Sequence, residues 1–266
     1  MPDDLTPLIV GCSWGNDTVA TVQFIREAGF TNVRCLYNDT GWAQEGWAER
    51  VDQMEAWVQS IGYSTARTAS EGMEALVRRK KAWPRQGMQF CTEALKIGPT
   101  LAWLAENDTD HLATGVNGKR AAESQVRAKT VEWIDPSLAW GGRRLWQPLF
   151  AHDAPARDGL IVRAGHEVLG HKSRECICVN TNRVGLRKLS ERSIGRVEAL
   201  ENEMGERKTM FRPARKMGAT GIREVIAWAN SAPGRYNPLQ DDLFSLDDGT
   251  GPSATDTGCD EGFCAS

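Results

Sequence analysis

The apolar run of residues 8–12 is followed by three residues that could help to bind an anion, Ser13, Gly15 and Thr18, and by a carboxylate, Asp17. The run is typical of a buried strand, and a helix is expected to open at Thr18. Backbone N–H groups of such a turn point at one place, Gly15 permits close approach, and the two hydroxyl groups add donors. The pattern predicts a phosphate site in which Asp17 holds Mg²⁺ on a pyrophosphate. The alternative is an ordinary capped strand–turn–helix junction.

A separate group of basic residues could also bind an anion. It consists of Arg120 and Arg127, which lie seven positions apart, with Lys119 and Lys129 beside them. On a helix, this spacing would place both arginines on one face. Planar guanidinium groups bind two oxygens at once, which suits phosphate or sulfate. The alternative is a solvated basic face.

The chain has seven cysteines, an odd number that excludes a complete set of disulfides. Cys12 and Cys35 fall in predicted strands and are expected in the core. Cys91, Cys176 and Cys178 are candidates for a metal or cluster site, because basic neighbours of the last two favour thiolates. The alternative is three isolated, reduced thiols.

The last two cysteines, Cys259 and Cys264, stand near the end of an acidic tail, and we expect residues 231–258 to be a mobile linker. Neighbouring carboxylates disfavour their thiolates. We expect them to act as nucleophiles only when the tail docks near Arg120 and Arg127.

The elements that must position these residues alternate between strand and helix patterns. Strands are predicted at 8–12, 33–37, 63–68 and 111–116, and helices from 18 and over 47–61, 71–81, 100–106, 157–164, 184–204 and 221–230. Such alternation is typical of an open α/β fold, a mostly parallel sheet with helices on both faces. We expect residues 1–150 to form this domain, 151–230 a helical part with the Cys176/Cys178 pair, and 231–266 a flexible tail.

Length and composition agree with a globular protein: 266 residues, net charge −3, 41% hydrophobic and 25% charged. These values argue against a collagen, a disordered chain or a disulfide knot. No apolar run approaches the roughly 18 residues of a membrane span, and the N-terminus lacks the basic region of a signal peptide. We therefore expect a cytoplasmic protein with no membrane partner.

Four segments together resemble a known family. The first loop resembles the PP-loop, Ser-x-Gly-x-Asp-Ser/Thr, of the adenine-nucleotide α-hydrolase superfamily of ATP pyrophosphatases, with Trp14 in place of the usual glycine. Three later segments resemble those of phosphoadenosine-phosphosulfate (PAPS) reductase-like proteins: Asp39-Thr40-Gly41, Cys91-Thr92-Glu93-Ala94-Leu95-Lys96, and the stretch from Gly118 to Arg127 that contains Glu123-Ser124. Their order over residues 8–180 identifies the chain as resembling this family.

The resemblance implies a twisted, mostly parallel sheet with an adenine nucleotide at the strand C-termini. It implies that the following residues bind the nucleotide: Ser13, Gly15, Asp17, Thr18, Asp39, Thr40, Gly41, Lys96, Gly118, Arg120, Glu123, Ser124 and Arg127. Some members hold an iron–sulfur cluster at places matching Cys91, Cys176 and Cys178, which implies a possible [4Fe–4S] site, although the C-x-x-C pattern is absent. Cys259 and Cys264 loosely match a mobile catalytic cysteine, without its Glu-Cys-Gly-x-His signature.

Two chemistries and one non-catalytic role follow as expectations. In the first, a tail cysteine reduces PAPS or a related sulfonucleotide with a thioredoxin-like partner, as the basic motif and the tail cysteines favour. In the second, Asp17 and Mg²⁺ bind ATP, and a nucleic-acid base is adenylated and then thiolated with sulfur from a donor. The third is a nucleic-acid-associated relative without catalysis.

Overall fold

The computed structural model describes residues 5–85, 88–125, 127–205, 209–211 and 221–231, and it centres on a six-stranded sheet. The strand order is β3-β2-β1-β4-β6-β5. The strands are β1 (Leu8–Gly11), β2 (Val33–Asp39), β3 (Ser64–Ala69), β4 (Thr114–Val116), β5 (Trp133–Ser137) and β6 (Arg143–Trp146). All neighbours pair in parallel except the edge strand β5, which runs antiparallel to β6.

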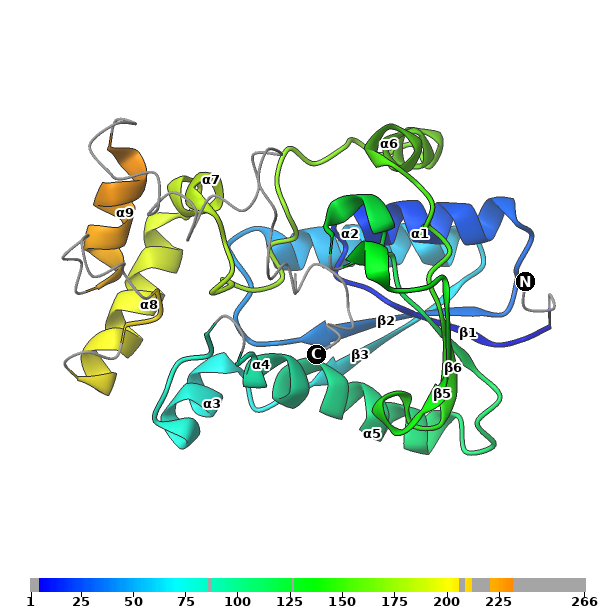
Figure 1. The fold of residues 1–266 in the computed structure, drawn as a ribbon, viewed down its shortest axis with the longest axis horizontal. Coiled ribbons are helices and arrows are strands. Elements are labelled where there is room, and N and C mark those ends of the chain that lie inside the picture. The colour runs from blue at the N-terminus through cyan, green and yellow to red at the C-terminus, as the bar shows by residue number, and fades with distance from the viewer. Residues whose placement is uncertain (1–4, 86–87, 126, 206–208, 212–220, 232–266) are drawn as a thin grey trace.

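Helices lie on both faces of the sheet (Figure 1), and side chains of the central strands alternate between these two layers. Leu8, Val10 and Cys12 face a core formed with α1 (Asn16–Glu27), α2 (Trp47–Ser60) and α6 (Ala154–Arg163). Ile9 and Leu36 face α5 (Gly98–Asn107) on the other side. Period-two alternation buries both faces of the sheet. The expected α/β fold is confirmed.

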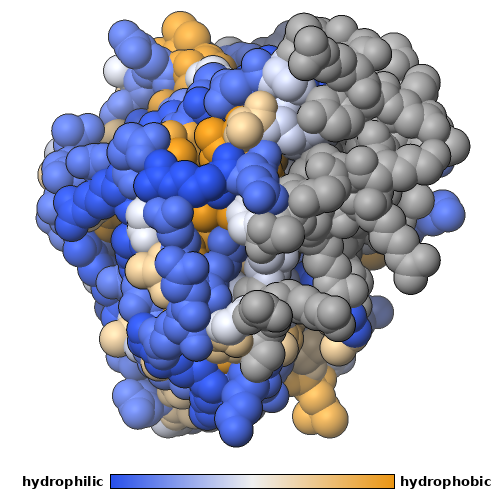
Figure 2. Space-filling model, turned by 90° about the vertical axis from the view of Figure 1, so that its left-hand side faces the viewer, coloured by the Kyte–Doolittle hydropathy of each residue, from blue (hydrophilic) through white to orange (hydrophobic). Residues whose placement is uncertain are grey.

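A second apolar core joins the sheet domain to the helices near the C-terminus. Its elements are α3 (Met73–Lys80), α4 (Phe90–Thr92), the π-helical turn η1 (Glu93–Ile97), α7 (Arg183–Arg187), α8 (Glu191–Met204) and α9 (Ile222–Asn230). The helical elements after residue 150 therefore divide between two cores, because α6 packs on the first through Leu160 and Ile161. The end formed by α8 and α9 shows mostly hydrophilic side chains where they are visible (Figure 2).

The observed elements differ from the predicted ones in two places. The helix predicted over 184–204 is two helices: α7 ends at Arg187, and Ser190 then caps α8 by accepting a hydrogen bond from the Ser193 amide. Strands β5 and β6 were not predicted. Three 3₁₀ turns complete the described elements: η2 (Ala121–Glu123), η3 (Arg127–Lys129) and η4 (Leu138–Trp140). Within the described parts of the chain, none of the helices has the length and apolar character needed to cross a lipid bilayer.

Glu201 fixes the arrangement of α8 and α9. Its carboxylate accepts hydrogen bonds of 2.8 Å from the backbone N–H groups of Met210 and Ile222, the latter being the first residue of α9. Burial is the main cause that raises the pKa of this carboxyl group. One side chain thus accepts hydrogen bonds from two buried amides, one of which, at the start of α9, has no acceptor within its own helix.

We predict that Glu201→Ala lowers the free energy of unfolding by about 2–3 kcal/mol, because both buried amides lose their acceptor. Urea unfolding followed by circular dichroism measures this change. The control is Glu198→Ala on the same helix, α8, as Glu201. It removes only an exposed ion pair with Arg223 of α9 and should change stability little. Equal stability of the Glu201 variant and wild type would contradict the assignment.

Candidate functional site

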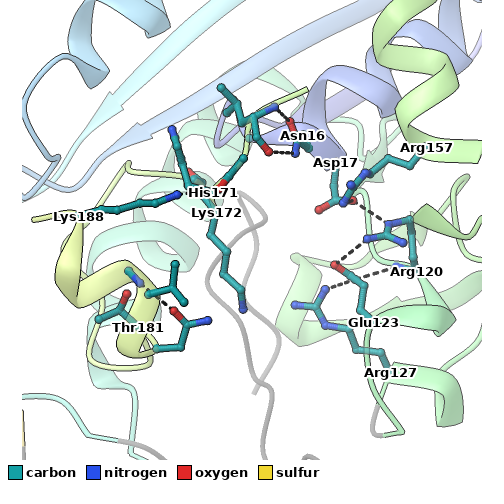
Figure 3. A pocket seen from close by; sticks show the side chains of 17 residues that line it. Asn16, Asp17, Arg120, Glu123, Arg127, Arg157, His171, Lys172, Thr181 and Lys188 are labelled. Carbon is teal, nitrogen blue, oxygen red and sulfur yellow. Dashed lines mark hydrogen bonds and ion pairs between the residues drawn. The ribbon is translucent and has the colours of Figure 1, made fainter. Parts of the chain in front are cut away.

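The main candidate site is a pocket of about 440 Å³ at the C-terminal end of β1 (Figure 3). One wall carries the start of α1, from Gly15 to Asp17, together with side chains of 3₁₀ turns and α6. The facing wall comes from residues 169–173 and from several residues between 181 and 188. Parallel sheets bind ligands at this edge, where strand C-termini and helix N-termini meet.

The hydroxyl groups of Ser13 and Thr18 form hydrogen bonds within the turn between β1 and α1. Thr18 Oγ1 lies 3.3 Å from both the amide nitrogen and the Oγ of Ser13, and Ser13 Oγ accepts from the Gly15 amide at 3.4 Å. Gly15 is the N-cap of α1, and no side chain in the described part of the chain caps this helix. The first-turn amides of α1 therefore face the pocket with capacity for an anion.

Two glycines permit close packing around this turn. A Cβ on Gly15 would lie 3.2 Å from the Cβ of Ser173, which belongs to the facing wall. A Cβ on Gly118 would lie 2.8 Å from Thr21 Oγ1 and 3.0 Å from the Asp17 carbonyl oxygen. Gly118 thus lets the loop that carries Arg120 lie directly against α1.

Carboxylates and guanidinium groups form a connected network on the first wall (Figure 3). Arg120 donates from Nε to Asp17 at 2.7 Å, and Arg157 lies 3.6 Å from the same carboxylate. Glu123 is ion-paired with Arg127 and lies 3.5 Å from Arg120. Burial, followed by the charge of Asp17, raises the pKa of Glu123, while the two arginines oppose the shift. The arginine side chains of this wall are thereby held in place before any ligand binds.

Arg120 and Arg127 do not share a helix, so the shared face that their spacing would give on a helix does not exist. Arg120 precedes η2 and Arg127 begins η3, while Ser124 Oγ accepts a hydrogen bond from the Arg127 amide between the two turns. The guanidinium groups nevertheless meet, because Glu123 binds both. Asp17 thus lies beside Arg120, on the same wall of the pocket as Arg127.

The charge of the lining is strongly unbalanced. Five basic side chains line the pocket against two carboxylates, Asp17 and Glu123. Lys172 extends into the cavity from the facing wall, and Lys188 donates to the Gly170 carbonyl at 3.0 Å (Figure 3). Burial lowers the pKa of His171, which is therefore mostly neutral at pH 7. Such a lining suits a ligand with several negative charges.

Three of these basic residues were not predicted as pocket residues: Arg157, Lys172 and Lys188. Arg157 lies on α6, more than a hundred positions from Asp17, and no motif surrounds it. Tertiary packing alone brings these three residues into one pocket.

The Asp39-Thr40-Gly41 segment lies away from this pocket and supports another part of the chain. Thr40 Oγ1 donates to the Glu175 carbonyl at 3.0 Å, and the Ile177 amide donates to the Trp42 carbonyl at 3.0 Å. Asp39 closes the turn by accepting from the Gly41 amide at 2.8 Å. The segment anchors the stretch that carries Cys176.

The cysteines Cys91, Cys176 and Cys178 line a second, small pocket together with Lys96, which forms a buried ion pair with Glu175. This pocket measures about 20 Å³, room for a single water molecule. Among the described residues, no group of three or more His, Cys, Asp or Glu is arranged to hold a metal ion. The expected [4Fe–4S] cluster does not fit this arrangement and is not supported.

The remaining cysteines divide between the core and the tail. Cys12 and Cys35 are fully buried in the first core, as expected. Burial, followed by a hydrogen bond with Cys35, raises the pKa of the Cys12 thiol, which keeps it protonated. Cys259 and Cys264 lie outside the described residues.

Comparison with known proteins finds a matching family for more than half of the chain. Residues 7–158 match the model of the phosphoadenosine phosphosulfate reductase domain. Among solved structures, the chain is similar to the phosphoadenylyl-sulfate (PAPS) reductase of Candida auris in complex with phosphate, with 12% identity and a TM-score of 0.43 over 63% of this chain and 75% of that chain. No curated protein matches the sequence. The matched segment contains the first wall of the pocket and ends before the facing wall.

We predict that Gly118→Ala destabilises the protein by about 1–3 kcal/mol, because the new Cβ forces the Arg120 loop away from α1. Gly195→Ala on α8 is the matched control: nothing lies within 4 Å of its added Cβ, and the same change should stabilise slightly. Thermal unfolding of both variants gives the comparison. A Gly118 variant as stable as wild type would show that this contact does not constrain the loop.

Proposed function

Since the chain belongs to the phosphoadenosine phosphosulfate reductase domain family, we propose that it is an enzyme that binds an adenine nucleotide in the pocket at the start of α1. The anionic end of the nucleotide lies against the first turn of α1. Arg120, Arg127 and Arg157 surround that end, and the reaction transfers or reduces sulfur.

The observation that carries this proposal is the meeting of a helix N-terminus without a side-chain cap and three arginines in one pocket. Amide N–H groups and the helix dipole favour negative charge at this point. Guanidinium groups bind phosphate or sulfate oxygens in pairs. Lys172 on the facing wall extends the positive lining, so that a ligand with two separated anionic groups is accommodated.

A sulfonucleotide such as PAPS agrees with the charges better than ATP does. Asp17 is neutralised by Arg120 at 2.7 Å and by Arg157 at 3.6 Å, so protein cations already occupy the place expected for Mg²⁺. A sulfonucleotide needs no metal ion where arginines offset its charge.

In the proposed reaction, a cysteine thiolate attacks the sulfur of the sulfate group. A sulfur–sulfur bond forms, the bond from sulfur to the phosphate oxygen breaks, and the nucleotide leaves with the electron pair, stabilised by the arginines. The enzyme thiosulfonate is then reduced by the two thiols of a thioredoxin-like partner, which releases sulfite, restores the cysteine and leaves the partner as a disulfide. Cys264 and Cys259 are the proposed nucleophiles.

The ATP route is a second candidate, favoured by the position of Asp17 in the first turn of α1 and within the pocket lining. There the carboxylate would exchange an arginine for Mg²⁺. The α-phosphate would be attacked by the acceptor, with release of pyrophosphate, before a sulfur donor replaces AMP.

We predict that the full chain binds adenosine 3′,5′-bisphosphate without Mg²⁺, and that Arg127→Met weakens this binding at least tenfold because a paired guanidinium contact is lost. Isothermal titration calorimetry measures the affinity. Arg163→Met, which removes only an exposed ion pair with Glu27, is the control. Incubation with PAPS and dithiol should yield sulfite. Pyrophosphate release from ATP with Mg²⁺ instead would favour the second route, and binding of neither nucleotide would refute the proposal.

We predict that replacing Cys264 and Cys259 together by serine abolishes sulfite formation and leaves nucleotide affinity unchanged, because a hydroxyl is a far weaker nucleophile than a thiolate. Each single variant identifies which thiol attacks. Mass spectrometry of wild type with PAPS alone should detect the thiosulfonate adduct on that cysteine. Unchanged turnover in the double variant would exclude the tail from the chemistry.

A further inference from the structure

Trp14 departs from the family pattern in a revealing way. The residue has φ +61°, and with Lys81 and His111 it is one of three described non-glycine residues with positive φ. A bulky side chain disfavours this conformation, which glycine adopts freely. The backbone of the loop therefore keeps the shape that the usual glycine would give, although the residue opposes it.

The indole of Trp14 does not disturb the pocket. The side chain is fully buried, points into the first core, and is absent from the described pocket lining, whereas Gly15 and Asn16 belong to that lining. Burial of an indole is strongly favourable and offsets part of the conformational cost. It does not by itself determine the direction of the peptide group that follows.

That peptide group is fixed by Arg50, which lies on α2. Arg50 Nε donates to the Trp14 carbonyl at 2.8 Å, and its guanidinium carbon lies 5.5 Å from the centre of the Trp47 ring. Because the peptide unit is planar and trans, the Gly15 N–H points the opposite way, toward Ser13 Oγ at 3.4 Å. Both ends of the unit that precedes the N-cap are thus held.

Arg50 has little other reason to be at this place. Among the described residues it forms no ion pair with a carboxylate, and its Nη2 is buried without a hydrogen-bond partner. A guanidinium group buried in this way costs free energy. Its directional contact is the bond to the loop carbonyl.

We infer that Arg50 is a positioning residue: by holding the Trp14 carbonyl it keeps the first-turn amides of α1 aimed into the anion pocket, in a loop that lacks the usual glycine. The inference rests on the proposed function for its consequence on binding. The loop geometry itself is independent of any ligand.

The test compares Arg50→Met with Arg34→Met. Arg34 is a matched control, since its guanidinium also lies 5.5 Å from a tryptophan ring, that of Trp103, and its Nε donates to Ser64 Oγ at 3.0 Å, away from the pocket. We expect Arg50→Met to weaken binding of adenosine 3′,5′-bisphosphate about tenfold, with the melting temperature almost unchanged. Arg50→Lys, which keeps the charge, should recover only part of the affinity. The control should bind like wild type.

A ligand-free measurement separates this inference from the proposed function. Hydrogen–deuterium exchange of a peptide covering residues 13–19 should be about tenfold faster in Arg50→Met than in wild type, because the loop loses one anchoring hydrogen bond. Unchanged exchange, or binding equal to wild type, would overturn the inference alone. Full recovery by Arg50→Lys would show that charge acts rather than position. Faster exchange in a protein that binds no nucleotide would refute the proposed function and leave the loop assignment intact.

Discussion

The buried ion pair between Asp17 and Arg120 is the interaction on which the pocket depends. It joins the first turn of α1 to a loop more than a hundred residues later, and both side chains are almost fully buried. Loss of one partner from such a pair typically costs about 3–5 kcal/mol, because a buried charge is left alone. The pair also explains why a carboxylate is tolerated in an anion site: it orients a guanidinium group, and the pocket as a whole stays positive.

Residues close in sequence were interpreted well, and residues brought together by packing were not. The turn from β1 to α1 was predictable, because an apolar run, a small polar loop and a helix start are local signals. A spacing of seven positions would bring Arg120 and Arg127 to one face of a helix, but Ser124 ends one 3₁₀ turn and caps the next. Their proximity arises from Glu123, whose role no spacing rule reveals.

The missed strands have a physical explanation as well. Strand β5 contains Pro136, which is tolerated only at an edge, and its register with β6 is irregular. A single-sequence pattern reads such a segment as a loop. The stacking of Trp133 on Trp146, with ring centres 5.4 Å apart, contributes to a pairing that strand propensity alone does not indicate. The facing wall of the pocket was also not predicted, because residues 169–188 come to face the start of α1 only in the folded chain.

The two walls of the pocket differ in how they are tied to the rest of the molecule. The first wall, which carries the arginines, is linked to α1 through the ion pair of Arg120 with Asp17 and the close contact of Gly118. The opposite wall lies beyond residues 7–158 and is held mainly through its own backbone, which forms hydrogen bonds with the side chain of Asn16 and, next to the wall, with the backbone of Trp42 and Gln44. Substitutions there can reshape what is accommodated beside the bound anion at small structural cost. Changes in the opposite wall can therefore alter which reaction partner fits, while the first wall keeps its capacity to bind an anion.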